Sequence, residues 1–381
     1  MTILKPALWA TISLGALTAS FGASALAQTA SPASPSMSDD SGTVQRADKD
    51  MRRVLEKLHA LGAKPIGTQS VEETRKGPTP ADAVKAVLKD EGKDAAALTA
   101  KLKVSKKDVT YPTGGGQQTI RIYTPEGSGG QPKPVVVYYH GGGWVIADLD
   151  TYEASAMAMA HKTGAIVASV EYRHAPENKF PAAHEDAFAA YQWVAKNAGQ
   201  FGGDPQRLAL MGESAGGNLA TNVAIMARDQ KVEAPLHMVL VYPVSGTNTD
   251  TPSYQKNAHA VPLSKPAMEW FFQNTVSKDA DRNDARLDLV GKADLKGLPD
   301  ATLITAEIDP LMSEGKALAD KLKQAGSKVK YENFAGVTHE FFGMDAVVKD
   351  AEKAQEFAAA ELKLALSQGA TGAVKVNAPA K

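Results

Sequence analysis

The stretch RLALMGESAGGN, residues 207–218, decides the fold of this chain. Its apolar part, 208–211, is typical of a buried strand, and a helical pattern follows it. Gly-x-Ser-x-Gly between a strand and a helix indicates a sharp turn that presents the Ser214 hydroxyl at the positive end of the helix. Such a turn leaves no room for a Cβ at Gly212 or Gly216. A chance match to this short pattern is the alternative, and the strand and helix around it count against chance.

The chain on both sides of this turn alternates between strand-like and helical patterns. The apolar, strand-like runs are 135–139, 165–172, 236–242, 301–306 and 329–334. The helical patterns are 152–162, 182–197, 215–228, 311–325 and 347–366. Strand–helix–strand units form right-handed parallel crossovers, so the sequence predicts an α/β fold with a mostly parallel central sheet flanked by helices. An antiparallel hairpin precedes them, with strands in 103–110 and 118–123.

Composition divides the chain into one large domain with additions at both ends. The large domain covers 91–366 and includes an insertion, 245–298, whose length favours a functional lid. Amphipathic spacing within 44–90 predicts cap helices before the first strand. Residues 28–43, rich in Ser, Pro and Ala, indicate a flexible linker, and 367–381 indicate a disordered tail.

Charge and composition exclude several classes of function. The 381 residues carry a formal net charge of −1, which gives no electrostatic reason to expect nucleic acid or an anionic membrane as a partner. The chain contains no cysteine, which excludes disulfides, thiolate nucleophiles and cysteine-ligated metal centres. Its hydrophobic fraction of 43% is ordinary for a globular protein with a sizeable core.

Residues 1–27 have the pattern of a cleavable export signal. Lys5 gives a short positive region, Ala7–Leu26 is uncharged and apolar, and Ala25-Leu26-Ala27 provides the small residues of a cleavage site. We therefore expect cleavage after Ala27 and a periplasmic or secreted mature protein without a stable membrane anchor. An uncleaved anchor is the alternative, because the apolar stretch approaches the length that spans a bilayer.

A second glycine-rich motif, HGGGW at 140–144, directly follows a strand-like run. Consecutive glycines let backbone amides approach a ligand closely, which suits the stabilisation of a developing oxyanion. The expected donors of this oxyanion hole are the amides of Gly141 and Gly142, together with that of Ala215 in the serine turn. A simple glycine turn is the alternative. We expect His140 to hold the loop in place without acting as acid or base.

Chain order selects the partners of Ser214. In enzymes with this serine turn, the acid and then the base follow the nucleophile. Of the three histidines after Ser214, His339 lies in a loop between the last strand and the last helix, where a rigid sheet can present a catalytic side chain. Asp309, at the end of the preceding strand, is the expected acid. Asp before Pro is also typical of a helix N-cap, and Glu307 is the second candidate for the acid.

Other chemistries fit the sequence poorly. His-Glu at 184–185 and at 339–340 begins the zinc motif H-E-x-x-H, but neither has the second histidine. The glycines at 114–116 lack the Lys-Ser or Lys-Thr of a phosphate-binding loop. S-x-x-K occurs at Ser313 and Ser327 without the S-D-N partner that this chemistry uses. We therefore expect no metal and no cofactor.

The motifs from residue 134 to the last helix resemble the hormone-sensitive-lipase-like branch (family IV) of the α/β-hydrolase esterases. Besides the serine turn, they are HGGGW at 140–144, DLDT at 148–151, YRHAPE at 172–177, FPA at 180–182, GGDP at 202–205, YP at 242–243 and DPL at 309–311. The resemblance implies a catalytic triad of Ser214, Asp309 and His339 in an α/β-hydrolase fold with a helical cap. It implies a carboxylesterase for small-molecule esters of short to medium acyl chain, and a possible homodimer.

Three positions depart from the family's pattern. Glu213 replaces the more usual Asp before the nucleophile, and Tyr152 stands where a histidine is common. Glu340 replaces the usual Gly after His339, and its carboxylate is expected to raise the pKa of the imidazole.

The identity of the substrate is open at this stage. The candidate walls of the substrate site are Trp144, Trp270 and Phe341, with Phe271 and Phe272 beside Trp270, although such an aromatic run is equally often core. The same mechanism serves lactones, amides and polyester oligomers, and specificity depends on pocket shape. A ligand-binding protein on this fold, like the gibberellin receptor of plants, is the alternative from another class. The retention of all three triad residues argues against it.

Overall fold

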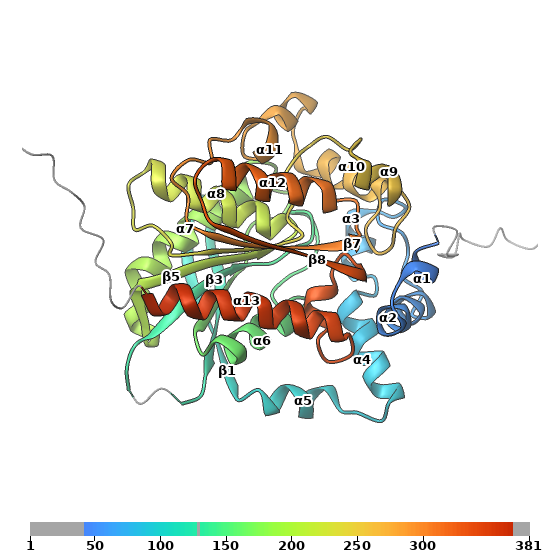
Figure 1. Cartoon of the computed structure of the whole chain (residues 1–381), viewed down its shortest axis with the longest axis horizontal. Helices are drawn as coiled ribbons and strands as arrows, with labels where there is room; N and C mark the ends of the chain where they lie inside the picture. The colour runs from blue at the N-terminus through green and yellow to red at the C-terminus, as the bar shows by residue number, and fades with distance from the viewer. Residues whose placement is uncertain (1–41, 128–129, 369–381) are drawn as a thin grey trace, which may run out of the picture. The chain divides into compact units, whose positions relative to one another are not determined.

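The computed structural model describes residues 42–127 and 130–368, all within the compact unit Ser36–Lys381 (Figure 1). Within these described ranges, no helix has the length and apolarity that crossing a membrane requires. The export signal, nearly all of the predicted linker and the tail beyond Gln368 lie outside the described residues. Those expectations stay predictions.

An eight-stranded sheet forms the centre of this unit, in the strand order β1-β2-β4-β3-β5-β6-β7-β8. The strands are β1 Val104–Thr113, β2 Gly116–Pro125, β3 Lys133–Tyr139, β4 Ile166–Val170, β5 Gly203–Glu213, β6 Met238–Val241, β7 Ala301–Ile308 and β8 Val329–Thr338. β1 and β2 form the predicted antiparallel hairpin, β2 also pairs antiparallel with β4, and the remaining neighbours are parallel. The predicted α/β fold with a mostly parallel sheet is confirmed.

Helices cover both faces of the sheet (Figure 1). One face packs against α6 Glu153–Thr163 and α13 Lys349–Gln368. The other face packs against α7 Ala182–Asn197, α8 Ala215–Asp229 and α12 Met312–Gln324. Because successive side chains of a strand point to opposite faces, Val136 of β3 lies in the first core and Val137 in the second.

The amino-terminal helices are more numerous than the sequence predicts. They are α1 Thr43–Arg46, α2 Lys49–Ala60, α3 Val71–Lys76, α4 Pro80–Asp90 and α5 Ala95–Lys101. The helical pattern expected from Val44 onward is interrupted at Asp48, whose amide donates to the carbonyl of Gly336 with an N–O distance of 2.8 Å. The start of α4 has a local cause, since Thr79 caps it and Pro80 fits the first helical turn.

The insertion predicted at 245–298 folds against the sheet domain. It forms the short helices α9 Pro252–Lys256, α10 Lys265–Thr275 and α11 Leu289–Lys292. Phe271 and Phe272 of α10 belong to the same buried core as residues of α7 and α8. The insertion is therefore held in place by core packing.

Candidate active site

Ser214 occupies the turn between β5 and α8, in a backbone conformation that few non-glycine residues adopt. Its φ of 55° lies in the left-handed region, and its ψ is −119°. The turn is as crowded as expected. A Cβ on Gly212 would lie 2.0 Å from the carbonyl oxygen of Gly216, and a Cβ on Gly216 would lie 1.9 Å from that of Tyr139. The amide of Ser214 donates to the carbonyl of Val241 (2.9 Å), which ties the turn to β6.

The crowding at Gly216 gives a stability prediction. Gly216→Ala should lower the free energy of unfolding by about 3 kcal/mol, because the added Cβ meets backbone atoms that cannot rotate away. Gly199→Ala is the matched control, since a Cβ there meets no atom within 4 Å. Its effect should stay within about 1 kcal/mol. Urea unfolding followed by tryptophan fluorescence measures both, and equal losses in the two variants would contradict the crowding.

His339 and Asp309 lie beside Ser214 at the carboxyl ends of neighbouring strands. His339 directly follows β8, and Asp309 directly follows β7. Nε2 of His339 lies 2.9 Å from Oγ of Ser214, and Nδ1 lies 2.7 Å from Oδ2 of Asp309. Since an ionised carboxylate only accepts hydrogen bonds, Nδ1 donates to Asp309 and Nε2 is left to accept from the Ser214 hydroxyl. The structure thus brings the three predicted residues together, and all three are buried.

The two carboxylate oxygens of Asp309 have different partners. Oδ2 faces His339, while Oδ1 accepts from the amide of Leu311 at 2.8 Å. The N-cap position of α12 belongs to Leu311, so the N-cap interpretation of Asp309 is wrong by two residues. Glu307, the second candidate for the acid, instead forms an ion pair with Lys256 at 3.3 Å.

Three carboxylates influence the imidazole of His339. Burial alone would lower its pKa, but Asp309, Glu340 and Glu213 together raise the pKa above the ordinary value of a histidine. The nearest oxygen of Glu340 lies 3.9 Å from Nε2. The position of Glu340 therefore agrees with the expectation that its carboxylate raises the pKa of His339.

Glu213, to which the sequence assigned no role, binds two tyrosines next to the triad. Its buried carboxylate accepts hydrogen bonds from the hydroxyls of Tyr138 (2.5 Å) and Tyr242. The ring of Tyr242 lies 4.5 Å from the ring of His339, measured between centroids. Burial raises the pKa of Glu213 to about 7, against the effect of the tyrosine hydrogen bonds. Glu213 therefore supports the imidazole through Tyr242.

The other two departures from the family pattern form one hydrogen-bonded pair. The hydroxyl of Tyr152 donates to Oε1 of Glu340 at 2.6 Å. A Cβ on Gly141 would lie 2.2 Å from this hydroxyl, so glycine is required there. Tyr152 and Glu340 also line the cavity that contains Ser214. The pair thus joins the glycine loop to the loop that carries the base.

The glycine loop after β3 presents unpaired amides. Gly142 and Gly143 have φ angles of 99° and 59°, which glycine adopts without strain. Among the described residues, no backbone oxygen accepts from the amides of Gly141, Gly142 or Ala215. Gly142 and Gly143 line the cavity with Ser214. Free amides near a serine hydroxyl are the donors that an oxyanion needs.

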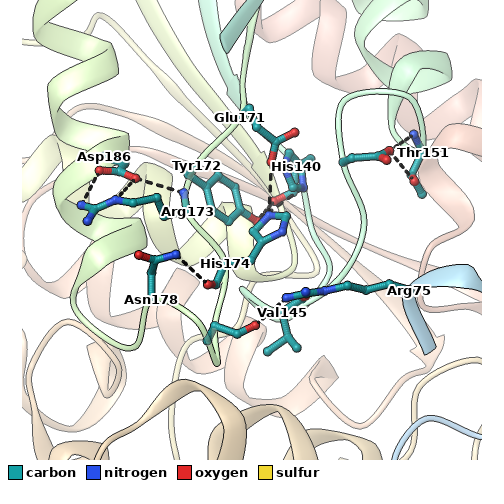
Figure 2. Close-up of polar contacts among 12 residues, drawn as sticks. Arg75, His140, Val145, Thr151, Glu171, Tyr172, Arg173, His174, Asn178 and Asp186 are labelled. Atoms are coloured by element: carbon teal, nitrogen blue, oxygen red, sulfur yellow. Dashed lines mark hydrogen bonds and ion pairs between the residues drawn. The ribbon is translucent and has the colours of Figure 1, made fainter. Parts of the chain in front are cut away.

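His140 is buried where the glycine loop leaves β3 (Figure 2). Its Nδ1 donates to the carbonyl of Gly141 at 2.8 Å, and its ring stacks on Tyr172 at 4.5 Å between centroids. The hydroxyl of Tyr172 donates to the carbonyl of His140 at 2.9 Å. Burial alone would lower the pKa of His140, but the carboxylate of Glu171 raises it overall. These contacts fit the expectation that His140 holds the loop.

Ser214 and His339 open into a cavity of about 210 Å³. The glycine loop, the cap helices and the insertion all contribute to its walls. A wider cleft of about 860 Å³ lies between the cap helices and the insertion. The residues common to both linings are Ile66, Thr74, Thr79, Pro80, Ile146 and Pro262. The two spaces are therefore neighbours, and the cap segments border both.

The aromatic residues predicted to line the substrate site lie in different places in the structure. Trp270 lines the wider cleft. Trp144 and Phe341 are core residues, 1% and 0% exposed, and neither lines the cavity or the cleft. Phe341 packs against Tyr242, with 5.9 Å between ring centroids. The aromatic walls of the cavity are Tyr152 and Phe271, and Phe271 is the neighbour of Trp270 in α10.

The chain is similar to known esterases over most of its described length. A family profile described as alpha/beta hydrolase fold matches residues 136–343. Carboxylesterase NlhH of Mycobacterium tuberculosis is 38% identical over 273 residues, covering 71% of this chain and 85% of that protein. Ethyl acetate hydrolase of Pseudomonas putida is 36% identical over 61% of this chain and 74% of that protein. The solved structure of a hyperthermophilic esterase from the archaeon Pyrobaculum calidifontis matches with a TM-score of 0.74 at 34% identity, over 84% of this chain and 99% of that one.

The sheet topology and these matches define the class of protein. The chain belongs to the α/β-hydrolase family, in its hormone-sensitive-lipase-like branch. The prediction of an enzyme with a serine-hydrolase fold is confirmed.

Proposed function

We propose that this chain is a carboxylesterase in which Ser214 is the nucleophile, His339 the base and Asp309 the acid that orients it. The two contacts of 2.9 and 2.7 Å that join these side chains in chemical order carry the proposal. His339 takes the proton of Ser214 as Oγ attacks the acyl carbon, and gives it to the leaving alcohol. Water then releases the acid from the acyl-enzyme by the same steps. Asp309 holds the tautomer in which Nε2 can accept a proton.

The oxyanion formed in this reaction would be held by the amides of Gly141, Gly142 and Ala215. Ala215 is the first residue of α8, so the positive end of the helix dipole adds to its amide. Gly143 is a further candidate, because it lines the cavity. Each such donor typically contributes a factor of about 10²–10³ in rate.

The cavity size supports a preference for short to medium acyl chains. Its volume of about 210 Å³ is small compared with the roughly 300–1,000 Å³ of drug-sized ligand sites. Met268 and Phe271 of α10 supply apolar wall. The neighbouring cleft between the cap helices and the insertion offers more room to the other part of an ester.

A p-nitrophenyl ester series tests the proposed activity. We expect kcat/KM to be highest for acyl chains of up to about six carbons and to fall for longer chains, because the cavity beside Ser214 is small. A p-nitrophenyl phosphonate should inactivate the enzyme with one adduct per chain, located at Ser214 by peptide mass spectrometry. An adduct on another residue would refute the assignment of the nucleophile. Turnover of lactones or amides without turnover of any ester would refute the ester specificity.

The surroundings of His339 give a pH prediction. The rate requires a neutral imidazole, so kcat/KM should fall as the pH drops through the raised pKa of His339, at a midpoint above about 6.5. Glu340→Gln removes a negative charge 3.9 Å from Nε2, so the midpoint should move to lower pH. pH–rate profiles of both proteins measure this. A midpoint unchanged or higher in the variant would contradict the effect of Glu340.

We also propose that the chain is exported and cleaved after Ala27. The support is the order of Lys5, the apolar stretch Ala7–Leu26 and the small residues before Gln28. Intact mass of the protein from the periplasm or the medium of an expressing bacterium tests this. A product that retains Met1, or one found only in the membrane fraction, would refute it.

A homodimer remains a prediction from the family resemblance. Sedimentation equilibrium of the mature protein measures its mass directly. A single species with the mass of one chain at micromolar concentration would refute it.

A further inference from the structure

Three possible metal ligands converge behind the glycine loop (Figure 2). They are His140, at the end of β3, and Glu171 and His174, just after β4. We propose that Nε2 of His140, a carboxylate oxygen of Glu171 and Nε2 of His174 form a binding site for Zn²⁺ or a related divalent transition metal ion.

The distances suit a tetrahedral ion. Oε1 of Glu171 lies 3.4 Å from Nε2 of His140 and 3.2 Å from Nε2 of His174. One ligand atom from each residue falls within 4.8 Å of the other two. Zinc bonds of about 2.0–2.1 Å in tetrahedral geometry place neighbouring ligand atoms about 3.4 Å apart. The three atoms therefore need only small shifts to share one ion.

The two histidine nitrogens face the Glu171 oxygen at ion-pair distance, without the geometry of a full hydrogen bond. Nε2 of His140 and Nε2 of His174 are both buried, and neither has a hydrogen-bond partner among the described residues. Nδ1 of His140 donates to the carbonyl of Gly141, so in the neutral ring Nε2 carries the lone pair. A lone pair and a carboxylate that face each other need a proton or a metal ion between them, and the second histidine beside the same oxygen suits a metal ion. A metal-binding histidine commonly has this arrangement, with its other ring nitrogen bonded to a carbonyl.

Strand register builds the cluster into the fold. β3 and β4 are neighbouring parallel strands with Tyr139 opposite Val170. The next residue on each strand, His140 and Glu171, therefore leaves the sheet at the same place. This proposed site contradicts the expectation of no metal, which rested on the absence of cysteine and of a complete H-E-x-x-H motif, whose ligands lie on one helix. His174 completes the set three residues after Glu171.

The surroundings favour a transition metal in a structural role. Imidazole ligands favour Zn²⁺ over Mg²⁺ and Ca²⁺, which prefer oxygen. The negative charge of Asp148 favours a positive charge at His140. The positive charge of Arg75 disfavours a positive charge at His174. The guanidinium of Arg75 is itself neutralised by a two-contact bond with Glu177. None of the three ligands lines the cavity of Ser214, so the ion would brace the glycine loop without touching substrate.

Cobalt substitution tests the site directly. Chelator-treated protein titrated with Co²⁺ should show the intense visible absorption of a tetrahedral ion, saturating at one ion per chain, and Zn²⁺ should displace it. His174→Leu and Glu171→Gln should each weaken Co²⁺ binding by more than about 100-fold. His59→Leu, which removes an exposed histidine of α2, is the matched control and should bind as the parent does. Zn²⁺ should raise the melting temperature of the parent and the control only.

Three results would overturn the proposal. The first is a parent protein that binds no Co²⁺. The second is equal binding by the parent and both ligand variants. The third is loss of binding in His59→Leu, which would place the ion on the surface. Far-ultraviolet circular dichroism equal to that of the parent shows that His174→Leu and Glu171→Gln are folded, independently of metal and of the proposed reaction.

Discussion

Ser214→Ala should reduce kcat/KM for p-nitrophenyl esters by about 10⁵–10⁶-fold, because the oxygen that attacks the acyl carbon is removed. The fold should remain, since alanine differs from serine only by the missing hydroxyl and introduces no clash. The variant should lose the phosphonate adduct completely. Steady-state kinetics and intact-mass measurement check the two effects separately.

Ser313→Ala is the matched control for this experiment. Ser313 begins one of the two S-x-x-K patterns, and its half-buried Oγ accepts from the amide of Ser253 at 3.1 Å. Its replacement should leave kcat/KM within about twofold, since its hydroxyl bonds to none of the three proposed catalytic side chains. Full activity in Ser214→Ala, or its loss in Ser313→Ala, would refute the proposed mechanism.

Asp309→Asn should reduce kcat by about 10⁴-fold while the protein keeps its stability. Oδ1 of an asparagine can still accept from the amide of Leu311, so the turn before α12 is preserved. The amide nitrogen would instead face Nδ1 of His339 and donate to it. The imidazole then carries its proton on Nε2, where it cannot accept the proton of Ser214.

Glu307→Gln is the matched control for Asp309→Asn, because it also replaces a carboxylate by an amide at the end of β7. Glu307 lies two residues before Asp309 and pairs with Lys256 on a partly exposed surface. Its replacement should cost less than about 1 kcal/mol of stability and leave kcat within about twofold. A large loss of kcat in Glu307→Gln together with a small loss in Asp309→Asn would identify Glu307, and not Asp309, as the acid that orients His339.

The convergence of Ser214, Asp309 and His339 was predictable from the sequence because of how parallel sheets are built. The carboxyl ends of β5, β7 and β8 lie along one edge, so residues just beyond each strand meet there. Chain order and strand ends were therefore enough to select Asp309 and His339. Gly212 was predictable because a Cβ there would clash with the backbone of the turn itself, whereas a Cβ on Gly216 would clash with the carbonyl of Tyr139 at the end of β3.

Side chains that depend on several elements at once were not predictable. Trp144 and Phe341 are aromatic residues near the catalytic motifs, so the sequence suggested that they line the substrate site. Packing by distant segments decides where their side chains point, and both are buried in the core. Tyr152 and Glu340 are 188 positions apart in the sequence, so no local sequence pattern could predict their hydrogen bond. The break between α1 and α2 likewise comes from a bond between Asp48 and Gly336.

The position of Gly143 links specificity to catalysis in this enzyme. A Cβ on Gly143 would lie 2.2 Å from the ring of Phe271, and the hydroxyl of Thr275 donates to the carbonyl of Gly143 at 3.4 Å. Helix α10 thus lines the cavity through Met268 and Phe271 and also supports the loop that would hold the oxyanion. We therefore expect a substitution of Phe271 that enlarges the cavity to change turnover as well as selectivity.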